Sequence, residues 1–291
     1  MSHLMAFGMG YSARRVARRL AGEGWQVSGS ARTAEGAAVI SAAGWQGLIF
    51  DGLAPSQAVT ESTNAITHAL VSVPPDADGD PVLRWHASDL AGAGHLGWIG
   101  YFSTVGVYGD HQGRVVDEDT ACTPTSERGH RRCRAEEAWR AFGATTGKRV
   151  SIFRLPGIYG PGRSVIDQLR AGTARRIVKP GQVFNRIHVD DIANAVAAAI
   201  RLPTKRDTFN ISDDEPASSE DVLVYAAQLL GLPAPEPIAF DAANLSAMAA
   251  SFYAESKRVS NLRMKTQLSV SLDFPTFREG LRALVIPSLD T

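Results

Sequence analysis

Apolar runs and helical patterns alternate along the first half of the chain. Within residues 14–24, Val16 and Leu20 fall on one helical face, and arginines occupy the opposite face. Strands that alternate with helices in this way predict a parallel sheet covered by helices on both faces. The short apolar runs that we predict as its strands are residues 3–7, 25–30, 47–50, 65–73, 95–103 and 149–155.

After residue 160 the pattern changes to helices separated by loops. Ser218 lies three residues before Asp221, as in a capping box, and we expect an aspartate to cap the helix within residues 186–202. This half therefore predicts a smaller α/β lobe that folds against the first. Its predicted elements are helices at residues 166–174, 186–202, 218–231 and 274–284 and a short strand at residues 208–212.

Composition and charge exclude several classes of protein. The 291 residues carry 30 basic and 30 acidic side chains, a formal net charge of zero, which argues against a dedicated nucleic-acid binder. The two cysteines, Cys122 and Cys133, have no metal-ligand spacing with the histidines, so we expect no metal site. No apolar run is long enough to span a bilayer, and no signal peptide is evident. With two lone thiols, these features predict a cytoplasmic protein without membrane association.

A glycine-rich turn joins the first predicted strand to the first helix. Gly8, Gly10 and Ala13 form the pattern G-x-G-x-x-A, with Tyr11 and Ser12 between them. The first glycine permits the tight turn, the second lets a pyrophosphate approach the backbone, and the small third residue lets the helix pack on the strand. The helix N-terminus then offers N–H groups to phosphates. These five residues predict dinucleotide binding, and the alternative is an ordinary strand–helix turn.

The end of the second predicted strand bears on the choice of cofactor. An NAD site places an acid there for the ribose hydroxyls, whereas this chain has Arg32 and Thr33 after Ala31. An arginine suits a 2′-phosphate, so we predict NADP, with NAD as the second choice. The alternative is a solvent-exposed arginine without a partner. Asp51, after the third strand, could accept from the adenine amino group or act as a turn aspartate.

Three further stretches resemble one known family. "YFSTVGVYGD" (101–110), "FRLPGIYGPGRS" (153–164) and "RIHVDDIANAV" (186–196) are similar to motifs of the extended short-chain dehydrogenase/reductases, the nucleotide-sugar epimerase/dehydratase group. With the glycine turn and "FPTFREGL" near the end, the resemblance covers nearly the whole chain. It implies a doubly wound Rossmann sheet that binds NAD(P). The expected domains are residues 1–160, to which residues 186–202 return, and a substrate-side lobe of residues 161–291.

The resemblance also implies roles for individual residues. Thr104 falls on the family's catalytic Ser/Thr, whose hydroxyl contacts the reacting oxygen of the substrate; the alternative is a strand-end hydroxyl satisfied by backbone. Ser72, Val73 and Pro74 match the loop over the cofactor's ribose and phosphates. Pro156 opens the loop near the nicotinamide amide.

Residues 128–134 hold four arginines and a histidine, which could form a nucleic-acid patch, a solvated helix face or part of an active site. The resemblance places Arg128 where the family has its catalytic tyrosine and Arg132 where it has the paired lysine. An arginine stays protonated and cannot exchange a proton as a phenol does. We therefore expect both side chains to face the cleft, with Arg132 on the nicotinamide ribose and Arg128 on an anionic ligand. Glu136, four residues from both Arg132 and Arg140, is expected in a surface ladder.

Two functional hypotheses remain from the sequence. The first is an NADP-dependent oxidoreductase or isomerase-like enzyme with an altered active site and a small, preferably anionic substrate. The second is a non-catalytic NADP-binding sensor or partner-binding module. Neither involves nucleic acid, and we expect a monomer or homodimer.

Overall fold

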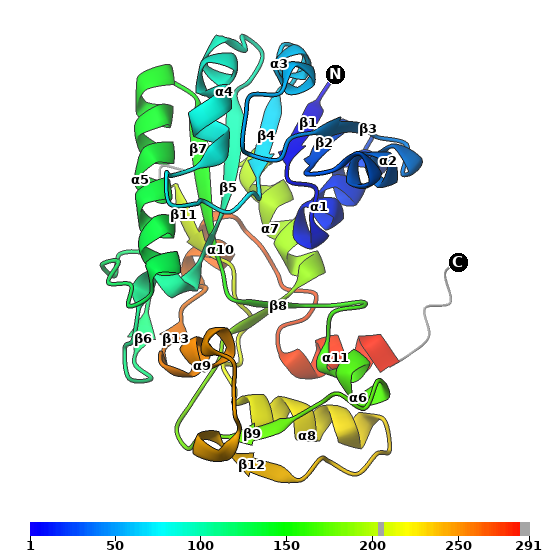
Figure 1. Cartoon of the computed structure of the whole chain (residues 1–291), viewed down its shortest axis with the longest axis vertical. Coiled ribbons are helices and arrows are strands. Elements are labelled where there is room, and N and C mark those ends of the chain that lie inside the picture. Colours follow the sequence, from blue (N-terminus) through cyan, green and yellow to red (C-terminus); the bar gives the residue numbers. More distant parts are fainter. Residues whose placement is uncertain (203–206, 286–291) are drawn as a thin grey trace.

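The computed structural model describes residues 1–202 and 207–285 (Figure 1). Within these residues, seven strands form one sheet in the order β11-β7-β5-β4-β1-β2-β3, and all of its strand pairs are parallel. The predicted α/β fold with a doubly wound parallel sheet is confirmed. The strands are β1 (His3–Phe7), β2 (Gln26–Ala31), β3 (Gln46–Ile49), β4 (His68–Val71), β5 (Trp98–Thr104), β7 (Arg149–Leu155) and β11 (Thr208–Asn210).

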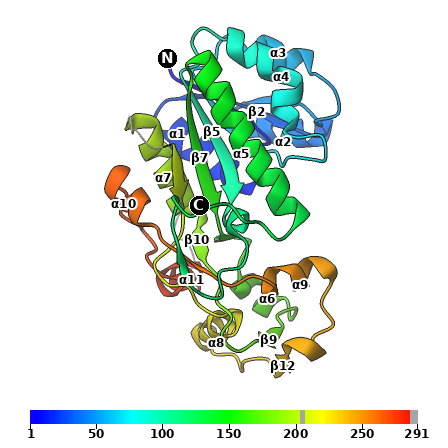
Figure 2. The same ribbon diagram turned by 90° about the vertical axis from the view of Figure 1, so that its left-hand side faces the viewer.

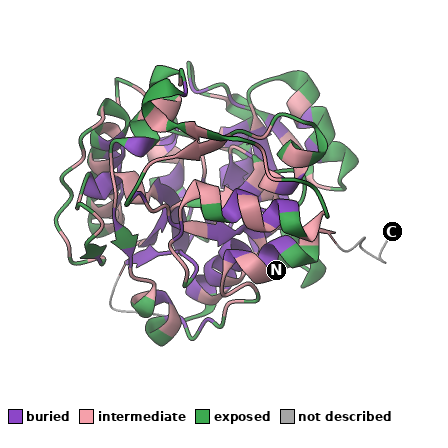
Figure 3. Cartoon of the chain, turned by 90° about the horizontal axis from the view of Figure 1, so that it is seen from below, coloured by how far each residue is buried: buried purple, intermediate pink, exposed green. Residues whose placement is uncertain are grey.

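Two helical layers cover the sheet because successive side chains of each strand point to opposite faces. Leu4 and Ala6 of β1 belong to the core cluster that includes α1 and α7, and Met5 and Phe7 belong to the cluster that includes α3, α4 and α5. Figure 2 shows α5 and α7 on opposite sides of β5 and β7, and Figure 3 shows the buried residues gathered at the sheet. The helices of this domain are α1 (Tyr11–Gly22), α2 (Ala34–Ala42), α3 (Gln57–Thr63), α4 (Pro81–Gly92), α5 (Glu127–Thr146) and α7 (Val189–Arg201).

The smaller lobe lies beyond the carboxyl ends of the strands (Figure 1). Its core joins α6, α8 and α11 through Ile166, Val222, Ala226, Phe277 and Leu281. Short parallel pairs, β10–β8, β12–β9 and β13–β6, link its segments to each other and to the larger domain. The remaining elements are η1 (Val105–Tyr108), β6 (Val115–Val116), β8 (Gly157–Tyr159), α6 (Val165–Arg170), β9 (Arg176–Val178), β10 (Arg186–His188), α8 (Ser219–Leu229), β12 (Pro237–Ala239), η2 (Phe240–Ala242), α9 (Ala247–Tyr253), β13 (Arg258–Val259), α10 (Leu262–Gln267) and α11 (Phe277–Val285).

Two segments of the second half belong to the larger domain in space. Helix α7 packs in the same core cluster as α1, and Asp190 at its start pairs with Arg15 of α1, with Nη2 2.7 Å from Oδ2. Strand β11 pairs with β7 and extends the main sheet, although residues 208–210 were predicted in the smaller lobe. A three-residue strand carries too little pattern to reveal which sheet it joins.

The start of α7 differs from the prediction. Residues 186–188 form strand β10, and His188 caps the helix by accepting from the Asp190 N–H through Nδ1. The expected aspartate cap is therefore wrong, because Asp190 lies in the first turn and its carboxylate is used by Arg15. Ser218 does cap α8 and accepts from the Asp221 N–H at 2.9 Å. Among the described helices, none is long and apolar enough to cross a membrane.

Candidate functional site

The predicted site residues follow the carboxyl ends of six neighbouring strands. Because the strands are parallel, these ends meet at one edge of the sheet. Helix α1, after β1, lies on one face, and α4, after β4, lies on the other. The crevice between these strands is thus a topological switch point, where open α/β sheets bind ligands. In sheet order the residues are Pro156 after β7, Thr104 on β5, Ser72, Val73 and Pro74 after β4, Gly8 and Gly10 after β1, Arg32 and Thr33 after β2, and Asp51 after β3.

The two glycines of the turn have different physical roles. Gly8 has φ of 82°, and a Cβ there would lie 3.0 Å from Val73 Cγ2 and 3.3 Å from Val73 N. Close packing of the segment after β4 therefore requires glycine at this position. A Cβ on Gly10 would meet no described atom within 4 Å. The backbone at Gly10 thus borders open space, into which a ligand could approach.

Helix α1 begins at this opening without a side-chain cap, unlike several other helices of the chain. Asp80 caps α4, Ser126 caps α5 and Ser218 caps α8. At Gly10, the N-cap of α1, no described side chain accepts from the helix, and its first turn contains no acid. The N–H groups and the positive end of the helix dipole are therefore available to a phosphate. Ser12 and Ala13 are buried and let α1 pack closely on the sheet. This arrangement fits the pyrophosphate of a dinucleotide.

A loop of the smaller lobe lies across the glycine turn. The Tyr11 hydroxyl donates to the Pro161 carbonyl at 3.1 Å, and the Arg163 guanidinium lies 5.6 Å from the centroid of the Tyr11 ring. A Cβ on Gly160 would lie 2.6 Å from the Tyr11 hydroxyl oxygen, so glycine permits this approach. Exposed Arg163 thus adds a cation beside the turn. Sequence reasoning missed it because only the fold brings position 163 to residue 11.

The end of β2 presents both an arginine and an acid. Arg32 is exposed, and no partner for it is seen within the described chain. Thr33 caps α2 by accepting from the Gly36 N–H at 3.2 Å. Glu35 stands exposed in the first turn of the same helix, so an acid lies three residues after Arg32. Asp51 accepts from the Leu53 N–H at 2.8 Å and is exposed, which fits the turn alternative.

The hydroxyl of Thr104 is anchored at the end of β5. Its Oγ1 accepts from the Gly106 N–H at 3.1 Å and caps η1. This is the backbone-satisfied arrangement that was the alternative to a catalytic role. The hydroxyl proton remains able to donate to a ligand at the same time. Ser72 is fixed beside the glycine turn, because its N–H donates to the Phe7 carbonyl at 2.9 Å.

Arg132 does not project into an open cleft as predicted. It is buried, and its Nη1 donates to the Tyr101 hydroxyl at 3.0 Å and to the Phe102 carbonyl at 2.6 Å. Its guanidinium also lies 5.6 Å from the centroid of the Tyr101 ring. The close packing of α5 on β5 explains the difference, since position 132 faces that strand. Arg132 therefore joins helix to sheet beneath the end of β5.

The other arginines of the cluster lie at the surface. Arg131 Nε and Arg134 Nη2 both bind Glu127 Oε1, at 3.1 and 3.3 Å. Arg128, in the first turn of α5, is exposed, and within the described residues it shows no hydrogen bond or ion pair. The charge cluster therefore consists of buried Arg132, two arginines paired with Glu127 at the surface, and Arg128, which shows no partner within the described residues.

The prediction of Glu136 in a surface ladder is wrong. Its side chain is 1% exposed, and its carboxylate binds Arg154 at 3.1 Å to Nε and 2.8 Å to Nη2. Ser103 Oγ donates to it at 2.6 Å, and Arg140 Nη2 donates at 3.2 Å. Arg154 Nη1 also donates to the Tyr108 hydroxyl at 2.9 Å. This buried network was not predictable because the key partner, Arg154, lies on another element, β7, and not at helical spacing from Glu136.

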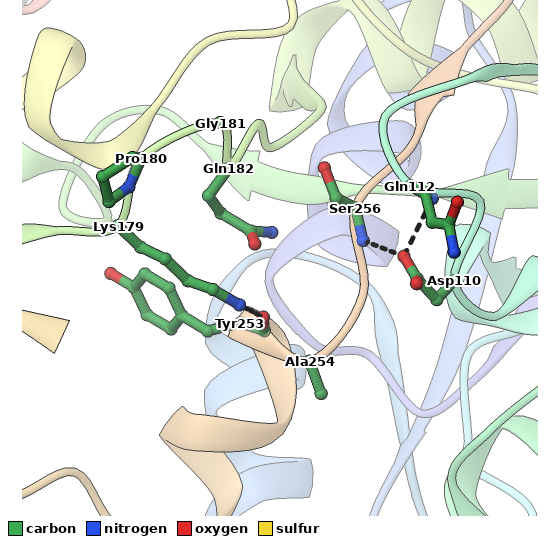
Figure 4. A pocket seen from close by; sticks show the side chains of 9 residues that line it. All are labelled: Asp110, Gln112, Lys179, Pro180, Gly181, Gln182, Tyr253, Ala254 and Ser256. Atoms are coloured by element: carbon green, nitrogen blue, oxygen red, sulfur yellow. Dashed lines mark hydrogen bonds between the residues drawn. The ribbon is translucent and has the colours of Figure 1, made fainter. Parts of the chain in front are cut away.

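A polar pocket opens where the loop after η1 meets the smaller lobe. Figure 4 shows Asp110, Lys179, Gln182 and Ser256 among its lining residues. Asp110 Oδ1 accepts from the Ser256 N–H at 2.8 Å, which ties the two segments together. The Lys179 ammonium donates to the Tyr253 carbonyl. Within residues 1–202 and 207–285, no cluster of three or more His, Cys, Asp or Glu side chains could hold a metal ion.

Comparison with known proteins identifies the family. Residues 8–212 match the family described as NAD dependent epimerase/dehydratase, a match that spans most of the chain. The chain therefore belongs to this family, which agrees with the resemblance read from its motifs.

Two relatives and one more distant structure illustrate the likeness. A functionally unknown conserved protein from Silicibacter pomeroyi DSS is 46% identical, with 98% of each chain covered and a TM-score of 0.90. Protein YeeZ of Escherichia coli (strain K12) is 27% identical over 244 residues, covering 81% of this chain and 86% of YeeZ. UDP-glucuronic acid 4-epimerase from Bacillus cereus, solved in complex with NAD, is 19% identical with a TM-score of 0.75, covering 97% of this chain and 95% of that one. At that identity the likeness concerns the fold alone.

Proposed function

We propose that the chain is an NADP-binding enzyme of the oxidoreductase or isomerase type, with an altered active site and a small, anionic substrate. The observation that carries the proposal is the open turn at Gly10 before the uncapped N-terminus of α1. An uncapped helix start facing open space is suited to bind a phosphate group. Membership of the epimerase/dehydratase family supports a nicotinamide dinucleotide as the ligand.

The residues at the strand ends would each bind a different part of the cofactor. The glycine turn would hold the pyrophosphate, with Arg163 as a nearby cation. Arg32 would bind a 2′-phosphate by charge-assisted hydrogen bonds. Val73 and Pro156 would contact the ribose and nicotinamide parts. The chemistry that a nicotinamide cofactor supplies when bound is hydride transfer.

The altered chemistry follows from the residues at the start of α5. Neither Arg128 nor Arg132 can exchange a proton near neutral pH, and Arg132 already donates to Tyr101 and Phe102. Thr104 would orient the reacting oxygen through its hydroxyl proton. Exposed Arg128, in the capped first turn of α5, would attract an anionic substrate.

Competitive titration of NADPH and NADH tests the cofactor preference. We expect tighter binding of NADPH, and Arg32→Asp should erase or reverse the preference because it replaces the phosphate-binding cation with an acid. Arg18→Asp is the matched control, since Arg18 is exposed on α1 and should leave the preference unchanged. Equal affinities in the unmodified protein would refute the role of Arg32.

A non-catalytic NADP-binding sensor is the second candidate, and the anchoring of Arg132 by β5 favours it. Both candidates predict slow or absent epimerisation or dehydration of UDP- and GDP-sugars, because general acid–base help contributes ~10²–10⁴ in rate. A screen that measures NADPH oxidation in the presence of small carboxylate and phosphate compounds distinguishes the two candidates. Turnover supports the enzyme, and NADPH binding without any turnover supports the sensor. Rapid turnover of a sugar nucleotide would contradict both.

A further inference from the structure

The chain's two cysteines come together beside the buried network of α5. Cys122 lies in the loop before α5, and Cys133 lies in the second turn of that helix. Arg154 Nη2, which donates to Cys122 Sγ, also binds Glu136, one helical turn after Cys133, so both thiols border the same buried ion pair. Cys122 is exposed, whereas Cys133 is half-buried, with Sγ 3.9 Å from the Val107 carbonyl. One sulfur is thus accessible to solvent, while the second is half-buried on the neighbouring helix.

The surroundings of Cys122 favour a thiolate. Arg154 Nη2 donates to Cys122 Sγ at 3.2 Å. Arg140 lies nearby and pairs with both Glu136 and Asp207, whereas Arg154 contacts Cys122 directly. Interaction with Cys133 and with these arginines, against the opposing effects of burial and Glu136, lowers the pKa of Cys122 to about 7. The same interaction and burial raise the pKa of Cys133.

The residues that follow Cys122 hold its loop in place. Thr123 Oγ1 donates to the Tyr108 carbonyl at 2.8 Å, and Thr125 Oγ1 donates to Glu255 at 2.6 Å. Gly109, with φ of 71°, permits the close approach of the Thr123 carbonyl. These contacts keep the Cys122 sulfur near Cys133.

We propose that Cys122 and Cys133 form a reversible redox site, with Cys122 as the attacking thiolate and Cys133 as the resolving thiol. The co-reactant is a low-molecular-weight disulfide. Cys122 attacks one of its sulfurs, a mixed disulfide forms, and one small thiolate leaves. Cys133 then loses its proton and attacks Cys122 Sγ, which releases the second small thiolate. The protein dithiol is oxidised to an intramolecular disulfide, and the small disulfide is reduced to two thiols.

Oxidation would join the loop to α5 covalently and remove the Cys122 thiolate from Arg154. Low-pKa, accessible cysteines with a neighbouring resolving cysteine are typical of redox sensors. The proposal is independent of the proposed function, because it requires neither a bound cofactor nor a substrate.

The test uses the full chain and glutathione disulfide, followed by alkylation and peptide mass spectrometry. We expect Cys122 and Cys133 to lose reactivity together and to appear in one cross-linked peptide pair within a single chain. In Cys133→Ser, the reaction should stop at a glutathione adduct on Cys122. Cys122→Ser should leave Cys133 alkylatable. Thermal melts of both variants verify the fold. Persistence of both thiols, a first adduct on Cys133, or disulfide-linked dimers in place of the internal bridge would overturn the proposal.

The rate of the first step provides an independent check. The groups that face Cys122 are Cys133, Arg154, Glu136 and Arg140. Adduct formation should rise to half of its maximum near pH 7. At pH 7 it should be about threefold faster than for an ordinary exposed thiol, since the larger thiolate fraction outweighs the lower nucleophilicity. A half-maximum near the ordinary thiol pKa would overturn the assignment of Cys122 as the activated group.

Discussion

Helices α1 and α5 both begin close to the ends of strands that border the crevice, but they differ in what surrounds them. Helix α1 begins uncapped, at a turn whose Gly10 faces open space. Helix α5 begins with a Ser126 cap, and its charged residues are largely bound to other protein groups. The start of α1 is therefore free for a ligand, whereas the α5 segment contributes mainly to the framework of the site.

The contrast shows that charge density is a poor guide to binding. Residues 128–134 hold four arginines and the first seven residues of α1 hold two, yet Arg132 is bound by β5, and Arg131 and Arg134 are bound by Glu127. The glycine turn has few reactive side chains, but at the first turn of α1, which follows it, no described side chain caps the N–H groups and no acid compensates the helix dipole. Unused hydrogen-bonding capacity, rather than the number of charges, marks the candidate binding site.

The largest expected effect concerns the framework role of α5. Glu136→Ala should lower the free energy of unfolding by about 3–5 kcal/mol, because it leaves the buried Arg154 without its counter-ion. The measurement is urea unfolding followed by circular dichroism. Glu127→Ala, on the same helix, is the matched control and should leave the midpoint close to that of the unmodified protein, since its ion pairs are exposed. A similar loss of unfolding free energy in both variants would show that the buried acid contributes no more to stability than the exposed one.

The next effect tests the start of α1. Gly10→Val places a side chain in the open space over the turn, so NADPH affinity should fall by ~100-fold, or about 2.7 kcal/mol. The melting temperature should change little, because a Cβ at Gly10 meets no described atom within 4 Å. Isothermal titration and a thermal melt measure the two quantities. Gly22→Val, at the end of the same helix, should leave affinity unchanged. Retained NADPH binding in Gly10→Val would place the cofactor elsewhere.

The strands of the parallel sheet and the glycine turn were predictable because they depend on local patterns. Apolar runs at regular spacing define strands of a parallel sheet, and Gly8 is required by a backbone angle and by contact with Val73. Strand β11 was assigned to the wrong lobe because its three residues acquire their place only from pairing with β7.

The side-chain part of the site was less predictable because it depends on tertiary partners. Glu136 has arginines four residues away on each side, which locally resembles a surface ladder, but its main partner Arg154 comes from β7. Arg163 reaches the glycine turn only because the smaller lobe folds across Tyr11. Sequence spacing records neither contact.

The smallest expected effect decides whether any part of the arginine-rich segment binds a ligand. Arg128 and Arg131 lie on the same helix, but Arg131 is paired with Glu127, whereas Arg128 is exposed and shows no partner within the described residues. If Arg128 holds an anion beside the cofactor, Arg128→Ala should weaken the binding of inorganic phosphate to the NADPH complex by about 1–3 kcal/mol, the contribution of one charged hydrogen bond. NADPH affinity itself should stay the same, and Arg131→Ala should change neither quantity. Titration calorimetry of the three proteins measures both constants. Equal phosphate binding in all three would remove Arg128 from the site and leave the start of α1 as the ligand-binding helix end of the pair.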